Sequence, residues 1–297
     1  MPISNNKPRD HHYIPVFYLK QWCGQNKRLI EFTVKRGNFI AKPVGPKGTG
    51  FQTDLYAFPE LPPHMAQHIE DVFLKYADNT ASLALEMHLS GKDIWTNELR
   101  SGWSRFLISL IIRHPDVMVD LRAATKRSWE ETGPASQARY EETREPHYPA
   151  TFDDYIAAVD PHIPTKVSLN AIIKAFDNEM LGTHINGMYW SVIDLSKAHH
   201  RLLTADRPLQ YLNLNNPSGF ISLPIGPTKL FLAANSAQSI INVRKLKPDK
   251  VVREINQFVV ARARRFVFAH DKSQVSFIKK HIHTRMEPPP LFPCFRQ

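Results

Sequence analysis

The sequence predicts an α+β protein in which a helical N-terminal half packs on a C-terminal antiparallel sheet that carries a basic terminal helix. Two patterns indicate this class: apolar residues recur at helical spacing in the first half, and short apolar runs separated by turn residues fill the second. With 42% hydrophobic and 22% charged residues among 297, the chain can bury one sizeable core or two small ones.

The first elements are expected to be short. Pro15 suits the first turn of a helix, so residues 11–14 should be extended and residues 15–22 helical. Residues 28–32 and 38–44 resemble the two strands of a hairpin, because a glycine-containing turn separates them.

A helix is predicted to begin at Pro62 and Pro63. Its apolar positions recur at helical spacing and comprise Ile69, Val72, Phe73, Tyr76, Thr80, Leu83, Ala84 and Met87. These residues are therefore expected to form its buried face.

The strongest helical pattern follows Gly91, with Thr96 or Asn97 as its N-cap. Its apolar stripe comprises Trp103, Phe106, Leu107, Leu110 and Ile111. One further turn reaches His114, so we expect this imidazole to point inward where Pro115 kinks or ends the helix.

Residues 133 to about 167 are acidic and interrupted by prolines, which favours an irregular surface insertion, and residues 168–181 should form a short helix. We expect one integrated domain over residues 1–270. Residues 271–297 are expected to form a basic, proline-rich tail whose last part, MEPPPLFPCFRQ, is extended.

From residue 189 onward, turn residues separate short apolar runs, which is typical of antiparallel strands. The expected strands are residues 189–194, 201–204, 219–223, 229–234 and 266–268. A helix that starts near Pro248 lies before the last of them.

Cysteine usage and hydropathy bear on the compartment. Cys23 and Cys294 are the only cysteines and share no CxxC spacing, which excludes a disulfide framework. No apolar run is long enough to cross a bilayer, and the polar first ten residues do not resemble a signal peptide. We therefore expect a cytoplasmic protein that has no membrane partner.

The positive charge is concentrated near the C-terminus. Residues 244–285 hold twelve Lys and Arg against three acids, so this segment carries a net +9 of the total +10. Such a region attracts nucleic acid or another polyanion, and the candidate contacts are Arg253, Arg262, Arg264 and Arg265. The alternative is a solvated basic surface that binds nothing.

Several segments together resemble a known family. They are HHYIPVFYLKQW at residues 11–22, TDLYAF at 53–58, IIRHP at 111–115, LLTADRPL at 202–209 and FISLPIGPTKLFL at 220–232. This set is similar to the uncharacterised bacterial and phage-borne family catalogued as domain of unknown function 4238, over residues 11 to about 268. The resemblance implies one integrated domain and no established activity. The positions that match the family's typical residues are His11, His12, Glu70, Arg113, Asp206 and Pro208.

A hydrolytic site can be assembled from the polar residues among these. His11 or His12 would act as acid or base, Asp206 at a strand end would orient or ligate, and Arg113 would bind an anionic oxygen. The structural alternatives are histidines that fasten the N-terminus and an aspartate that accepts backbone N–H bonds in a turn.

Three further residues are candidates for substrate binding. Arg207 and His114 would lie beside Asp206 or Arg113, and Glu70 would face Arg113 from another helix. The structural alternative for Glu70 is an ion pair with Arg113 between two helices.

A metal site is not expected. His64 and His68 share a helical face with Glu70 nearby, yet the HExxH order of zinc hydrolases is missing. The nucleotide-binding loops and the GxSxG elbow are absent too. Cofactor and oligomeric state therefore stay open.

The best functional interpretation is a hydrolase directed at a phosphate ester or a nucleic acid, with a His/Asp/Arg site. The alternative is a non-catalytic module that binds nucleic acid or protein through its basic C-terminal face.

Overall fold

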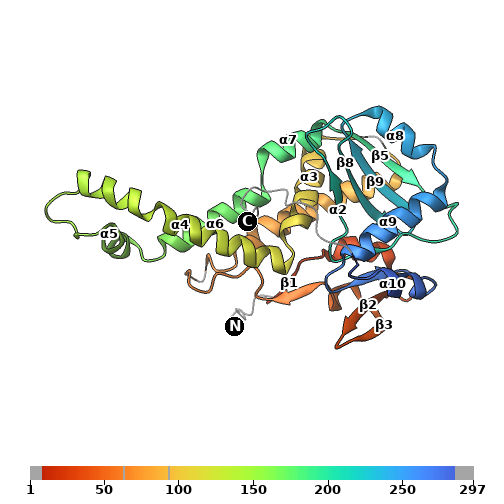
Figure 1. The fold of residues 1–297 in the computed structure, drawn as a ribbon, viewed down its shortest axis with the longest axis horizontal. Helices are drawn as coiled ribbons and strands as arrows, with labels where there is room; N and C mark the ends of the chain where they lie inside the picture. The colour runs from red at the N-terminus through yellow and green to blue at the C-terminus, as the bar shows by residue number, and fades with distance from the viewer. Residues whose placement is uncertain (1–8, 63, 93, 285–297) are drawn as a thin grey trace, which may run out of the picture.

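Helices surround two four-stranded antiparallel sheets and one two-stranded pair in a computed structural model that describes residues 9–62, 64–92 and 94–284 (Figure 1). This arrangement confirms the α+β class. Over the described residues, no helix is both long and apolar enough to cross a membrane.

The first sheet joins the two ends of the chain. Its order is β3 (Asn38–Val44), β2 (Leu29–Lys35), β10 (Val267–Ala269) and β6 (Thr204–Ala205). The expected hairpin is confirmed, and β10 lies between it and β6. The N-terminal hairpin is therefore held close to the basic C-terminal segment.

Short elements lie on either side of the β2–β3 hairpin, and those around Pro15 are the ones expected. Strand β1 (Asp10–His12) pairs with β4 (Phe51–Thr53), and α1 (Val16–Leu19) continues into the 3-10 turn η1 (Lys20–Trp22). A second 3-10 turn, η2 (Pro46–Gly48), precedes β4.

The second sheet has the order β5 (Tyr189–Asp194), β9 (Lys229–Ala234), β8 (Phe220–Gly226) and β7 (Gln210–Leu212). The strands expected around residues 189, 219 and 229 are confirmed, whereas β7 was not expected.

Helices cover both faces of this sheet (Figure 1). On one face, α8 (Ala237–Arg244) and α9 (Pro248–Arg262) pack against Leu230 and Leu232. On the other, α3 (Asn97–Ile112) places the ring of Trp103 5.4 Å from that of Phe231.

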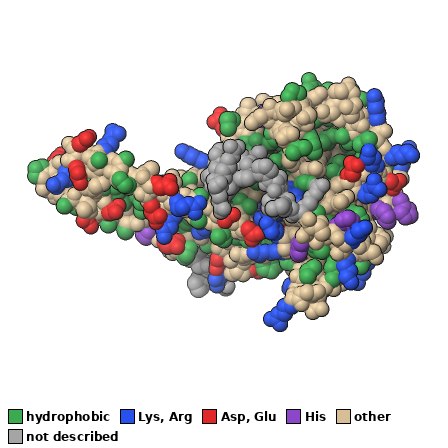
Figure 2. Space-filling model, in the orientation of Figure 1, with side chains coloured by type: hydrophobic (Ala, Val, Ile, Leu, Met, Phe, Trp, Pro, Cys, Tyr) green, Lys and Arg blue, Asp and Glu red, His purple; other side chains and the backbone are tan. Residues whose placement is uncertain are grey.

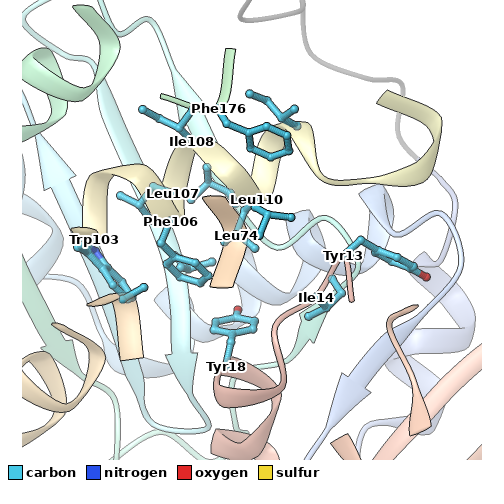
Figure 3. Close-up of a cluster of buried hydrophobic side chains, with 14 of the residues drawn as sticks. Tyr13, Ile14, Tyr18, Leu74, Trp103, Phe106, Leu107, Ile108, Leu110 and Phe176 are labelled. Atoms are coloured by element: carbon cyan, nitrogen blue, oxygen red, sulfur yellow. The ribbon is translucent and has the colours of Figure 1, made fainter. Parts of the chain in front are cut away.

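The main core centres on α3, as its apolar stripe predicted. Figure 3 shows Trp103, Phe106, Leu107 and Leu110 from this helix gathered with Phe176 and Tyr18. Thr96 is the N-cap, because its side chain accepts a hydrogen bond from the backbone N–H of Leu99. This core fixes the position of the residues that follow the helix.

The buried face predicted for the preceding helix is partly wrong. The chain first forms a π-helical turn, η3 (Ile69–Leu74), and then α2 (Lys75–Ser90). A π turn holds more residues than an α turn, so the helical phase shifts at Leu74. As a result Val72, Tyr76 and Leu83 are exposed instead of buried.

The irregular insertion expected at residues 133–167 is also wrong. Most of the segment is helical, and it forms much of an arm that projects from the body (Figure 1). The arm comprises α4 (Pro115–Thr143), α5 (Phe152–Val159) and α6 (Ile163–Phe176), and α7 (Glu179–Gly187) leads back to the sheet. Pro134 lies inside α4. Tyr140 of α4 donates to the carbonyl of Pro149 in the loop before α5, and its ring packs against Phe152 and Tyr155 of α5.

A tail beginning at residue 271 was expected, but α10 (Val275–His281) packs on α9 there, with Ile278 fully buried. The expectations for residues 286–297 and for Arg285 fall outside the described residues.

Candidate functional site

Asp206 follows β6, and its side chain binds backbone N–H groups instead of facing an open site. Its carboxylate is fully buried. It accepts hydrogen bonds from the backbone N–H groups of Arg264 at 2.9 Å, Arg265 at 2.5 Å and Phe266 at 3.3 Å. These bonds hold the connection between α9 and β10, which supports the structural alternative.

His12 has different partners. Its Nε2 lies 3.3 Å from the carbonyl oxygen of Lys47, and its ring packs against that of Phe51. Burial lowers the pKa of His12. Over the described residues, no hydrogen bond or ion pair joins His12 to Asp206, so the proposed catalytic pairing of these two lacks support.

Charged and polar groups from four segments nevertheless converge beside Asp206. We call them the junction cluster, and its members are Tyr13, His114, Asp116, Arg207 and Arg265. Sequence reasoning proposed His114, Arg207 and Arg265 as candidates but missed Tyr13 and Asp116.

His114 lies at the corner between α3 and α4, and it points inward as expected. It is the N-cap of α4: its Nδ1 accepts a hydrogen bond from the backbone N–H of Asp116 at 3.2 Å. Its Nε2 has no hydrogen-bond partner and lies 3.7 Å from Oδ2 of Asp206.

One carboxylate lies between two arginines in this cluster. Oxygens of Asp116 lie 3.4 Å from Arg207 and 3.8 Å from Arg265. Charge-assisted hydrogen bonds are usually about 2.7–2.9 Å long, so Asp116 holds each arginine loosely. The Asp116 side chain is 48% exposed, which places the cluster at the surface.

Tyr13 forms the inner wall of the cluster. Its ring packs edge-on against His114, with centroids 5.6 Å apart, and the guanidinium of Arg265 lies 5.9 Å from its ring centroid. Its hydroxyl points away from the hydrophobic side chains around it (Figure 3). Burial raises the pKa of Tyr13, and Arg265 opposes this shift.

A second polar region lies between β1, η3, α2 and α3. We call it the N-terminal polar group, and it comprises His11, His12, Glu70, Asp78 and Arg113. The sequence proposed four of these residues and missed Asp78.

Arg113 is fully buried, and its partner is Asp78 rather than Glu70. Its guanidinium donates to Asp78 at 2.9 Å and to the hydroxyl of Ser109 at 2.7 Å. The ion pair expected between Glu70 and Arg113 is absent from the described contacts. Glu70 feels the Arg113 charge at longer range.

Glu70 has the most unusual carboxyl of this region. Burial raises its pKa to about 7, although the charge of Arg113 opposes the shift. Its Oε2 is buried without a hydrogen-bond partner. A carboxyl with a pKa near 7 is able to exchange a proton at neutral pH.

His11 is buried and acts in the scaffold. Its Nδ1 accepts a hydrogen bond from the backbone N–H of Tyr56 at 3.0 Å, and the two rings are stacked 5.5 Å apart. Burial lowers the pKa of His11. This supports the structural alternative for His11.

Arg253, one of the candidate nucleic-acid contacts, lines a groove. This basic groove, of about 560 Å³, lies between α9 and α10, and Lys247, Lys250, His200 and Phe277 line it as well. Figure 2 shows the Lys, Arg and His side chains gathered at this edge of the molecule.

The other three arginines lie elsewhere. Arg262 is buried, donates to the carbonyl of Leu209 at 3.0 Å and packs over the ring of Phe258. Arg264 and Arg265 occupy the connection bound by Asp206. Of these three, Arg262 is used inside the fold, and Arg264 and Arg265 lie outside this groove.

Over the described residues, no group of three or more His, Cys, Asp or Glu side chains is arranged to hold a metal ion. No curated protein and no solved structure matches the chain. One family model does match, over residues 10–273, and its description is protein of unknown function, DUF4238. Since the match covers most of the sequence, the chain belongs to the DUF4238 family.

Proposed function

We propose that the protein binds nucleic acid through the basic groove between α9 and α10. The observation that carries this proposal is the convergence of Lys247, Lys250 and Arg253 on one groove. All three side chains belong to exposed residues, so they are able to reach phosphates without unfolding any element.

The single acid in the groove is already engaged. Asp249 accepts a hydrogen bond from the backbone N–H of His199 at 2.8 Å, which orients its carboxylate toward the backbone. Phe277 adds a half-buried aromatic ring on which a base can stack.

The floor of the groove favours binding without sequence preference. Asn256 accepts from the backbone N–H of Leu203 and donates to the carbonyl of Arg201 and to Gln274. Its hydrogen-bonding capacity is therefore used inside the protein. Recognition then rests on charge and stacking, which every nucleic acid offers.

Fluorescence anisotropy with a labelled single-stranded oligonucleotide tests this proposal. With three cations in the groove, the logarithm of the binding constant should fall with the logarithm of salt concentration with a slope of about −2. Arg253→Gln should weaken binding about fivefold at 0.1 M salt and make the slope shallower by about 0.7.

The arm offers a matched control. Lys250 and Glu254 form an i,i+4 pair at 4.0 Å on α9, and Lys126 and Glu130 form an equivalent pair at 3.9 Å on α4. Lys250→Gln should weaken binding, whereas Lys126→Gln should not. Equal losses from both variants would mean that binding reflects net charge rather than this groove.

A second candidate function is hydrolysis of a phosphate ester or nucleic acid at the N-terminal polar group. The observation that favours it is the Glu70 carboxyl with its pKa of about 7, set beside the Arg113–Asp78 pair. Glu70 would exchange the proton, and half-buried His12, on which the Asp78 charge acts, would be the second acid or base.

Phosphodiesterase assays with and without added divalent metal test this second function. Glu70→Gln should abolish turnover, while Glu86→Gln, an exposed change on α2, should leave it intact. Full activity of Glu70→Gln would remove Glu70 from the reaction. The two cysteines support a cytoplasmic setting for either function.

A further inference from the structure

We infer that the protein associates head to tail, with the arm tip of one copy seated in the basic groove of a second copy. The arm tip is defined as residues 129–160, which span the end of α4, the loop after it and α5. The inference rests on the proposed function in one respect, since it takes the same basic groove to be open to a partner. Its main test needs no nucleic acid.

The first argument is the separation of charge along the chain. The arm tip holds eight acids against two arginines and carries a net −6, whereas the whole chain carries +10. The rest of the chain therefore carries +16. Figure 2 shows the acidic side chains along the arm and the Lys, Arg and His side chains at the opposite edge of the body. Surfaces of opposite sign attract each other and guide two proteins into one orientation.

The second argument is the placement of the acids on the arm tip. Eleven residues, close to three helical turns, separate the glutamates of each of two pairs, so all four lie along one side of α4. The pairs are Glu130 with Glu141 and Glu131 with Glu142, and all four residues are exposed. Tyr140 lies on another side of α4, where its ring packs on α5. The row of glutamates therefore faces outward and not onto α5.

The present partners of these glutamates are exposed side chains of the same helix. Glu130 pairs with Lys126 at 3.9 Å, and both side chains are more than half exposed. Glu141 accepts a hydrogen bond from the amide of Gln137. Exposed pairs of this kind contribute little to stability, so lysine or arginine side chains of a second copy are able to replace them.

The third argument is that the arm tip has a shape of its own. The rings of Tyr140 and Tyr155 lie 5.2 Å apart, and the ring of Tyr148 packs edge-on against Tyr155 at 5.3 Å. Thr151 caps α5 by accepting a hydrogen bond from the backbone N–H of Asp154. A surface that is already ordered loses little conformational entropy when it binds.

The groove offers the complementary chemistry. Lys250 and Arg253 are exposed on α9, and Lys247 precedes that helix. Phe277 of α10 adds a half-buried aromatic ring to the same groove. Tyr148, in the loop of the arm tip, is 38% exposed. Its ring is therefore able to pack on Phe277 while the glutamates meet the cations.

The positions of the two surfaces favour a contact between copies. In Figure 1 the arm projects at one end of the longest axis of the molecule, and α9 and α10 lie toward the other end. The arm tip therefore cannot reach the groove of its own chain. A pair joined in this way leaves one arm tip and one groove unoccupied, so association continues to longer chains or closes into a ring.

Sedimentation velocity of the full chain at about 0.05 M salt tests the inference. The average mass should rise with concentration, with a dissociation constant on the order of 10 µM, and return to that of the monomer at about 0.5 M salt. Tyr148→Ala should weaken association about fivefold. Tyr189→Ala, at an exposed tyrosine of β5, is the matched control and should leave association unchanged.

Exchange of charge between the two surfaces identifies the contact. One variant reverses the arm tip with Glu141→Lys and Glu142→Lys, and another reverses the groove with Lys250→Glu and Arg253→Glu. Each variant alone presents like charges at the two surfaces and should stay monomeric. Their equimolar mixture brings opposite charges together again and should associate about as tightly as the wild type.

Net charge and folding are controlled separately. Glu60→Lys combined with Glu86→Lys changes the net charge by the same amount as the arm-tip variant, at exposed positions outside the arm tip. This control should associate like the wild type. Thermal unfolding of every variant shows whether a loss of association is a loss of the fold.

Three results would overturn the inference. They are a wild type that stays monomeric at low salt, a mixture of the two folded reversed variants that does not associate, and a Glu60/Glu86 control that loses association equally. An oligonucleotide in the groove should dissociate the copies. Association without oligonucleotide binding would remove the proposed function alone, and oligonucleotide binding by a protein that stays monomeric would remove this inference alone.

Discussion

The basic groove and the junction cluster draw on the same positive C-terminal segment but use its charges in opposite ways. In the groove, Lys250 pairs with Glu254 at 4.0 Å, and both side chains are more than half exposed. In the junction cluster, Arg265 donates its backbone N–H to Asp206 and its side chain to Gln52. The groove lysine is only weakly paired, whereas the Arg265 guanidinium, 40% exposed, lies among Gln52, Asp116 and the ring of Tyr13.

The difference teaches that the location of a charge, rather than the net count, decides what it binds. A solvated lysine gives up little structure when it meets a phosphate. A buried arginine such as Arg262, which donates to the carbonyl of Leu209, gives up stability if it turns toward a ligand. The net +9 of residues 244–285 therefore overstates the charge that faces solvent.

The largest effect is expected from Asp206→Ala, which tests whether Asp206 stabilises the fold. If Asp206 is a scaffold residue, its loss leaves the buried N–H groups of residues 264–266 without an acceptor. The free energy of unfolding should fall by about 3 kcal/mol, as measured by urea denaturation. The exposed change Asp194→Asn, at the end of β5, is the control and should cost less than about 1 kcal/mol. If both variants lost equally little free energy of unfolding, Asp206 would not be a scaffold residue and would again be a catalytic candidate.

The next effect concerns pH and the buried carboxyl of Glu70. A glutamate in the unfolded chain loses its proton near pH 4.5, whereas folded Glu70 keeps its proton up to about pH 7. The folded state therefore loses stability as pH rises from 4.5 through 7. Glu70→Gln, which carries no charge, should be more stable than wild type at pH 8 by about 2 kcal/mol and no more stable at pH 4. Parallel stability curves for the two proteins from pH 4 to pH 8 would show that Glu70 ionises normally.

Two arginine substitutions separate a charge used in the fold from one exposed in the groove. Arg262→Met removes the donor to the buried carbonyl of Leu209 and should lower the free energy of unfolding by about 1.5 kcal/mol while oligonucleotide affinity is kept. Arg253→Met should do the reverse, with a loss of affinity and unchanged stability. Thermal unfolding and anisotropy on both variants check this. Similar behaviour of the two arginines would contradict the division between fold and surface.

The smallest expected effect is at the rim of the groove. Glu254 forms a weak, exposed pair with Lys250, so Glu254→Gln removes a competitor for that lysine. Oligonucleotide affinity should rise about twofold at low salt, and the gain should vanish at high salt. A gain that persists at high salt would show that the effect is not electrostatic.

The sequence predicted those parts of the fold that local chemistry determines. The Thr96 cap and apolar stripe of α3, the β2–β3 hairpin and the bounds of β5 and β9 are confirmed because each depends on its own residues. Two of the expectations that failed have a clear physical reason. The π turn at η3 shifted the helical phase. Helix α4 contains Pro134 and many acidic residues, a composition that is more typical of loops.

The candidate site was predictable in its parts but not in its assembly. Asp206 was proposed as a catalytic residue, and the structure favours the alternative in which it accepts backbone N–H bonds. The donors lie almost 60 residues later rather than in the same turn. Tyr13 and Asp116 carried no motif, because their role depends on chain segments that meet only in the folded protein. Asp78 was missed for the same reason.

Helix α4 has a mechanical consequence of its own. It begins beside the junction cluster, with Asp116 in its first turn, and ends in the projecting arm (Figure 1). At 1.5 Å per residue its 29 residues make a rod about 43 Å long. A tilt of about 5° at the root of such a lever carries its far end through roughly 4 Å. A change too small to notice at Asp116 therefore becomes a displacement at the tip that a pair of spin labels can measure.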